Sequence, residues 1–99
     1  MSQDTKSGLL SLPLSGRIDS GSAPALEAEI SSALDAAPGA SRLVFDAERL
    51  EYISSAGLRV LLSAQKRMAS QGPMKVKHVN ETIQEIFEVT GFSDFLNIE

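Results

Sequence analysis

The chain has 99 residues, of which 42% are hydrophobic and 22% charged, and this fits one globular domain with a single core. It contains no cysteine, which excludes disulfide scaffolds, thiol catalysis and thiolate-bound zinc. Its formal net charge of −4 has the wrong sign for binding nucleic acid or an anionic membrane. Because neither a signal peptide nor a membrane-spanning apolar run is evident, we expect a cytoplasmic protein without direct membrane insertion.

The first predicted strand covers residues 9–14, where three leucines alternate with Ser11 and Pro13. Proline cannot donate to a strand ladder, so we expect this strand at a sheet edge or Pro13 at a bulge. A helix is then predicted from Ser22, just before a proline, to Pro38-Gly39, because its apolar residues recur at helical spacing.

The middle of the chain predicts a strand, a loop and a second helix. Residues 43–45 are continuously apolar, which is typical of a short strand buried on both faces between helix layers. A buried strand, a loop and a helix start are then expected to meet within residues 46–62. The second helix is predicted to begin at the pair Ser54 and Ser55 and to stop at Gly72-Pro73.

The last third of the chain predicts one more strand and one more helix. Residues 74–79 alternate between apolar and polar, as in a strand with one wet face. Asn80 can cap a third helix, and Gly91 suits the left-handed position after its end. The tail is expected to dock through Phe92, Phe95 and Leu96. This alternation of strands and helices predicts one α/β domain, with a mostly parallel or mixed sheet of about four strands against three to four helices.

Motifs for catalysis are absent or incomplete. His78 is the one histidine, and a metal site needs three or four convergent donors, so we assign it no role and expect no metal. Ser55-Ala56-Gly57 lacks the glycine at position 53 that a nucleophile elbow requires. The S-x-x-K match beginning at Ser63 lies within a predicted helix and has no partner motifs. With no phosphate-binding loop either, we expect no catalytic residue, no cofactor and no enzyme activity.

The most informative stretch is the one in which the loop after residue 45 meets a helix start at Ser54 and Ser55. A serine in the first turn of a helix lies among unpaired N–H groups at the positive end of the helix dipole, where an anion such as a phosphate is stabilised. The alternative is that either serine is simply an N-cap. Two adjacent serines permit both, with Ser54 capping the helix and Ser55 exposed.

Residues 53–62, Ile-Ser-Ser-Ala-Gly-Leu-Arg-Val-Leu-Leu, resemble the signature of the STAS domain family, in which a strand-loop-helix corner presents a regulatory serine. Residues 14–19 resemble the family's turn of strand, glycine, hydrophobic residue and aspartate, and residues 86–92 resemble its last helix and glycine cap. The resemblance implies a STAS-like domain over residues 9–99, preceded by a short polar segment over residues 1–8.

Within this family, the chain resembles the anti-sigma factor antagonists. The resemblance implies a binding protein that sequesters an anti-sigma factor, itself a serine kinase of the histidine-kinase-like ATPase fold, and releases it when Ser55 is phosphorylated. A serine phosphatase of the metal-dependent PP2C-like class is the implied second partner. Ser54 is the second choice for phosphorylation, because many antagonists have aspartate at that position. The partner-binding residues are expected to be Asp19, Ser20, Ser54, Ser55, Ala56, Gly57, Leu58 and Arg59.

Other interpretations stay open. Many family members begin with an extra strand, which we expect to be missing or vestigial here, because only seven polar residues precede Gly8. The alternative function is a non-catalytic STAS scaffold or accessory subunit of a stress-signalling or membrane-transport complex. Weak nucleotide binding is compatible with the family, and a serine hydrolase would have His78 as its only candidate base.

Overall fold

The computed structural model describes residues 8–94 and 96–98, which form a series of alternating strands and helices. In chain order the elements are β1 (Leu9–Ile18), α1 (Ala23–Ala36), β2 (Arg42–Ile53), α2 (Ser55–Met68), β3 (Met74–Lys77), α3 (Glu81–Thr90), the short 3-10 helix η1 (Phe92–Asp94) and β4 (Asn97–Ile98). The predicted α/β class, with about four strands and three to four helices, is confirmed.

The four strands form one sheet in the order β1-β2-β3-β4. All three pairings between these described strands are parallel, so of the two predicted arrangements the structure has the parallel one and not a mixed sheet. The physical reason is that each strand is followed by a crossover containing a helix, which returns the chain to the same end of the sheet.

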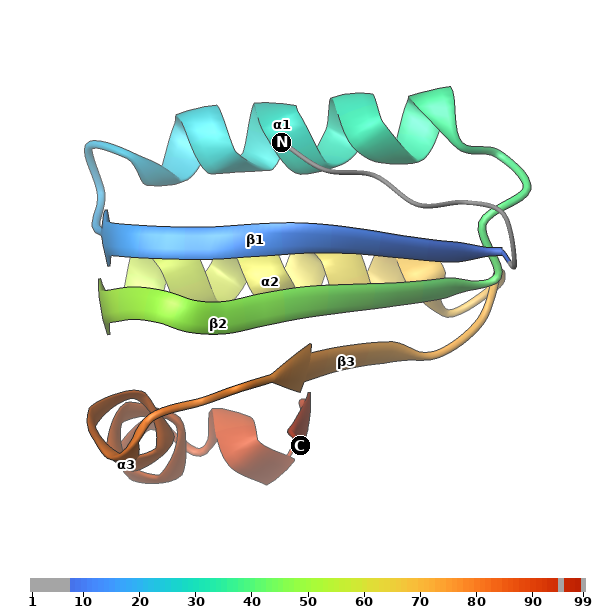
Figure 1. Cartoon of the computed structure of the whole chain (residues 1–99). Coiled ribbons are helices and arrows are strands. Elements are labelled where there is room, and N and C mark those ends of the chain that lie inside the picture. Colours follow the sequence, from blue (N-terminus) through green and yellow to red (C-terminus); the bar gives the residue numbers. More distant parts are fainter. Residues whose placement is uncertain (1–7, 95, 99) are drawn as a thin grey trace.

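The helices lie on one face of the sheet. Right-handed crossovers that all step in the same direction along a sheet place their helices on the same side, and Figure 1 shows α2 behind β1 and β2. The apolar core fills the space between that face and the helices. We predicted that residues 43–45 are buried on both faces, and this is wrong for Val44, which is half-buried on the face away from the core.

Strand β1 lies at the edge of the sheet, as Pro13 predicted. Pro13 pairs with Asp46 and the register shifts before Ser15, so both predicted accommodations of the proline, an edge position and a bulge, are present. The pairing continues to Ile18 and Ile53. The strand that we predicted over residues 43–45 is therefore longer than expected, because pairing with β1 extends β2 to Ile53 and leaves no long loop before Ser54.

The helix ends follow their sequence signals. Asn80 caps α3 by accepting from the N–H of Ile83 at 2.9 Å, and Gly91 after the helix has the predicted left-handed conformation with φ 82°. Ser22 stands before α1 without a capping side-chain hydrogen bond, which differs from its predicted role. Strand β3 ends at Lys77, earlier than predicted, because His78 adopts φ 59°.

The tail docks as predicted where it is described: Leu96 is buried and Phe92 packs partly buried against the core. Phe95 and residues 1–7 lie outside the described residues. The short N-terminal segment over residues 1–8 and the missing first strand therefore stay predictions. No helix in the described part of the chain has both the length and the apolarity to span a bilayer.

Candidate functional site

The corner between β2 and α2 turns at Ser54, which both its backbone and its side chain hold in place. Its N–H donates to the Ile18 carbonyl at 2.7 Å, which ties the start of α2 to the end of β1. Its hydroxyl accepts from the N–H of Gly57 at 3.5 Å, a long hydrogen bond that satisfies one of the unpaired donors at a helix start. The predicted capping role of Ser54 is confirmed.

Ser55 is the first residue of α2, and its side chain is exposed. Within residues 8–94 and 96–98, no group is hydrogen-bonded to its hydroxyl. The first turn of this 14-residue helix also carries no acidic side chain. An anion on Ser55 would therefore lie at the positive end of the helix dipole without a competing carboxylate in that turn.

The loop after β1 is organised by Asp19. Its Oδ1 accepts from the backbone N–H groups of Ser22 at 3.1 Å and Gly21 at 3.0 Å. These two hydrogen bonds favour the carboxylate and lower the pKa of Asp19 below its ordinary value. The Ser22 hydroxyl closes the loop by accepting from the Asp19 N–H at 3.0 Å. Asp19 thus shapes the loop that presents Ser20 to solvent.

An open depression between α1 and α2 brings three of the predicted binding residues together, namely Ser20, Ala56 and Arg59. It is lined by Ser20, Ala23, Pro24, Glu27, Ala56, Arg59 and Val60. Most of this lining is small or apolar, with Glu27 and Arg59 supplying one charge of each sign. Such a surface suits the docking of a partner side chain in a small pocket with a polar rim.

Two predicted binding residues lie beneath this surface and not on it. Leu58 is fully buried in the core, and Gly57 is buried against the sheet. Their assignment to the partner-binding surface needs correction: on the i, i+3, i+4 pattern of α2 they fall on the face that packs inward, so they position the corner and offer no side chain to a partner.

Sequence reasoning missed two residues beside this corner, Arg17 and Tyr52. They are register partners at the end of the β1–β2 pairing, and the Arg17 guanidinium carbon lies 4.6 Å from the centroid of the Tyr52 ring. Arg17 is exposed and Tyr52 half-buried. Arginine and tyrosine are enriched among the residues that dominate binding energies. No local pattern links positions so far apart in the chain, so only the strand register reveals the pair.

Three comparisons with known proteins agree with this fold. A family model described as "Mlab, STAS domain" matches residues 1–97. BtrV of Bordetella bronchiseptica, named as an anti-sigma factor antagonist, is 39% identical over 93 residues, which is 93% of this chain and 78% of that protein.

Solved structures of anti-sigma factor antagonists share the fold. The structure of one from Mycobacterium paratuberculosis superposes with a TM-score of 0.81 at 24% identity, covering 92% of this chain and 76% of that one. The unphosphorylated form of the antagonist SpoIIAA gives a TM-score of 0.74 at 20% identity, covering 92% and 79%. The phosphorylated form of Bacillus SpoIIAA gives 0.70 at 18% identity, covering 98% and 87%. The match over residues 1–97 and the identity to BtrV show that this chain belongs to the STAS domain family, in the branch that contains the anti-sigma factor antagonists.

Proposed function

We propose that this protein is an anti-sigma factor antagonist switched by phosphorylation of Ser55. The unmodified protein sequesters an anti-sigma factor that is a serine kinase of the histidine-kinase-like ATPase fold. Phosphorylation of Ser55 by that kinase releases it, and a metal-dependent phosphatase of the PP2C-like class restores the unmodified state. The observation that carries the proposal is the exposure of Ser55 at the first position of α2.

The different contacts of the two serines support the choice of Ser55 as the phosphorylation site. Ser54 is half-buried, and its hydroxyl already accepts from Gly57, so its modification would break the helix cap. Ser55 has no such structural task among the described contacts. A phosphate on Ser55 is stabilised by the helix start, so modification alters the surface without unfolding the domain.

The switch acts through charge placed inside a binding surface. We assign to that surface the exposed residues Asp19, Ser20, Ser55 and Arg59, the half-buried Ala56, and the Arg17–Tyr52 pair. A dianion introduced there must be desolvated when the partner docks, and it repels acidic groups of the partner. Because each 1.4 kcal/mol is tenfold in affinity, a cost of about 3 kcal/mol weakens binding roughly 100-fold.

Arg59 gives the phosphate a partner within the same helix. It lies four residues after Ser55, so the two side chains share a face of α2. An arginine can bind a phosphate through two parallel hydrogen bonds. In the phosphorylated protein Arg59 is then drawn toward Ser55 and away from the docking partner, which adds to the release.

The relatives' names support this proposal. BtrV and SpoIIAA are both named as anti-sigma factor antagonists, and SpoIIAA has been determined in a phosphorylated form. A kinase partner consumes ATP, so the proposal places the protein in the cytoplasm. The protein itself performs no catalysis in this scheme.

The test begins with Ser55→Ala as bait to isolate the kinase from the native cell, followed by work with purified proteins. Wild-type protein is incubated with the kinase and ATP, and the product is analysed by intact mass and peptide mapping. We expect one added phosphate, on Ser55. By calorimetry, Ser55→Ala should bind the kinase like the unmodified protein, and Ser55→Asp about 100-fold more weakly.

Ser70→Asp is the matched control, because Ser70 is an exposed serine just beyond the other end of α2. It adds the same charge and should leave the affinity unchanged within about twofold, well under the 1.4 kcal/mol that corresponds to tenfold. Phosphate found away from Ser54 and Ser55, or equal affinities of wild type and Ser55→Asp, would contradict the proposal. Recovery of transport subunits in place of a kinase would instead support the scaffold function.

A further inference from the structure

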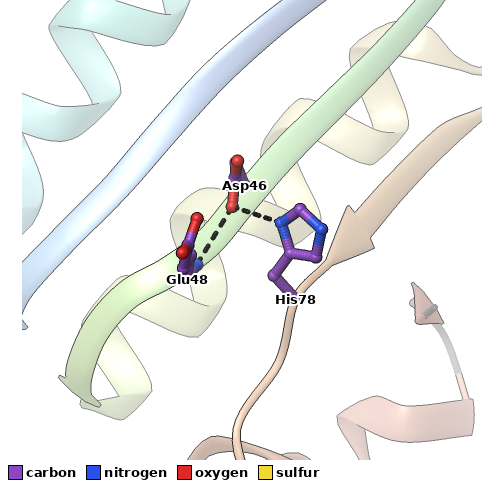
Figure 2. A group of neighbouring side chains, drawn as sticks. All are labelled: Asp46, Glu48 and His78. Atoms are coloured by element: carbon purple, nitrogen blue, oxygen red, sulfur yellow. Dashed lines mark hydrogen bonds and ion pairs between the residues drawn. The ribbon is translucent and has the colours of Figure 1, made fainter.

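The face of the sheet away from the helices carries a cluster of Asp46, Glu48 and His78. Asp46 and Glu48 are two residues apart on β2, and His78 directly follows β3, the neighbouring strand. One ligand atom from each residue, a carboxylate oxygen or an imidazole nitrogen, lies within 4.8 Å of the others. Figure 2 shows the three side chains gathered around β2. We propose that these three residues bind a divalent transition-metal ion such as Zn²⁺, a function beyond the Ser55 switch.

The distances suit a metal centre. His78 Nδ1 and Asp46 Oδ1 are 2.9 Å apart. Two donors that bind a Zn²⁺ ion at a tetrahedral angle, each with a bond of about 2.1 Å, are themselves about 3.4 Å apart. The His78–Asp46 pair is therefore about 0.5 Å closer than neighbouring zinc ligands, and the ion binds when this hydrogen bond opens by that amount and its proton is released. The Glu48 carboxylate lies in the same cluster, and its side chain is exposed, so it is free to turn toward the same point.

The donor set and its charge favour a divalent transition metal. One imidazole and two carboxylates are ligands that Zn²⁺ and similar ions accept, and the two negative charges match the ion. All three side chains are at least partly exposed, so water completes the coordination. Lys77 faces Asp46 from the paired position on β3, and its charge opposes the bound ion.

The sequence predicted no metal site because it offers one histidine and no local ligand spacing. The parallel pairing of Asp46 with Lys77 brings the next residue, His78, to the carboxylates of β2. The left-handed conformation of His78 then ends the strand beside them. Strand register therefore brings together donors that no local sequence pattern connects.

The test is calorimetric titration of the untagged protein with ZnCl₂, together with NMR of the imidazole. His78 is the one histidine and the chain has no cysteine, so its ring resonances report on the site without ambiguity. We expect one Zn²⁺ per chain and a shift of these resonances. His78→Asn, which tolerates the left-handed backbone, should weaken binding by about tenfold or more, since even loss of groups behind the ligands typically costs 10–100-fold.

Asp46→Asn and Glu48→Gln should each weaken Zn²⁺ binding in the same direction. Glu51→Gln is the matched control, because it removes the same charge from an exposed glutamate on the same strand outside the cluster. Far-UV circular dichroism checks that every variant is folded. The proposal is overturned by unchanged affinity in His78→Asn, by ring resonances that do not move at saturating Zn²⁺, or by an equal loss in Glu51→Gln and Glu48→Gln.

Discussion

A Cβ atom at Gly57 would lie 2.7 Å from Cγ2 of Ile18, so the first turn of α2 rests directly on the end of β1. The same atom would also lie 2.7 Å from Cγ1 of Ile53. Both contacts are with branched side chains in a packed core, which cannot give way freely. The lack of a side chain at Gly57 therefore allows the start of α2, with Ser54 and Ser55, to pack closely against the sheet.

Gly57→Ala should lower the free energy of unfolding by about 1–3 kcal/mol, the usual cost of overpacking a core. Urea denaturation measures it. Gly39→Ala is the control, because a Cβ there meets nothing within 4 Å. That variant should match the wild type or be more stable by about 0.4–1 kcal/mol. If the two variants were equally stable, the space between position 57 and Ile18 would be wide enough for a methyl group, and the prediction would be wrong.

Ser54→Ala should destabilise the protein by about 0.5–1 kcal/mol, at the lower end for loss of an N-cap, because its hydrogen bond to Gly57 is long. Ser55→Ala, one residue later and exposed, should stay within about 0.5 kcal/mol of the wild type. Paired chemical denaturation of the two variants provides the measurement. A larger loss for Ser55→Ala would mean that the capping roles are reversed.

Asn80 links α3 to β2, because its Nδ2 donates to the Leu50 carbonyl at 2.9 Å while its Oδ1 caps the helix at Ile83. Asn80→Ala removes both interactions and should cost about 1.5–2.5 kcal/mol. Asn80→Asp keeps the capping oxygen and loses the donor, so it should cost about 1 kcal/mol. We expect the urea midpoint to be highest for the wild type, lower for Asn80→Asp and lowest for Asn80→Ala. Identical midpoints for the two variants would contradict the dual role of Asn80.

The loop carboxylate of Asp19 should make stability depend on pH. Its pKa is lowered in the folded state, so it stabilises the fold above the ordinary value of 3.8, and this contribution disappears as the pH falls through the lower folded-state pKa. Asp19→Asn should therefore be less stable than wild type at pH 7, with the difference shrinking below about pH 3.8. Thermal unfolding between pH 2.5 and 7 tests it, with Glu29→Gln on the exposed side of α1 as control. If the difference in stability between Asp19→Asn and the wild type stayed constant over this pH range, the ionised carboxylate of Asp19 would not be its cause.

Much of the fold could be predicted because its signals are local. Pro13 indicated the edge strand, and Asn80 and Gly91 marked the two ends of α3. The Ser54 cap was likewise evident from its position before a helical pattern. Each of these features depends on the backbone preference or the hydrogen-bonding capacity of a single residue. Such a property can be inferred from that residue and its immediate neighbours in the sequence.

Other features depended on the tertiary structure. The sequence by itself determined the serine pair at a helix start. Only the packed structure decided that Leu58 faces inward, that Arg17 stacks on Tyr52, and that His78 meets Asp46. The reason is that strand register and helix orientation result from burying the whole apolar face at once, so they bring together residues that share no local pattern.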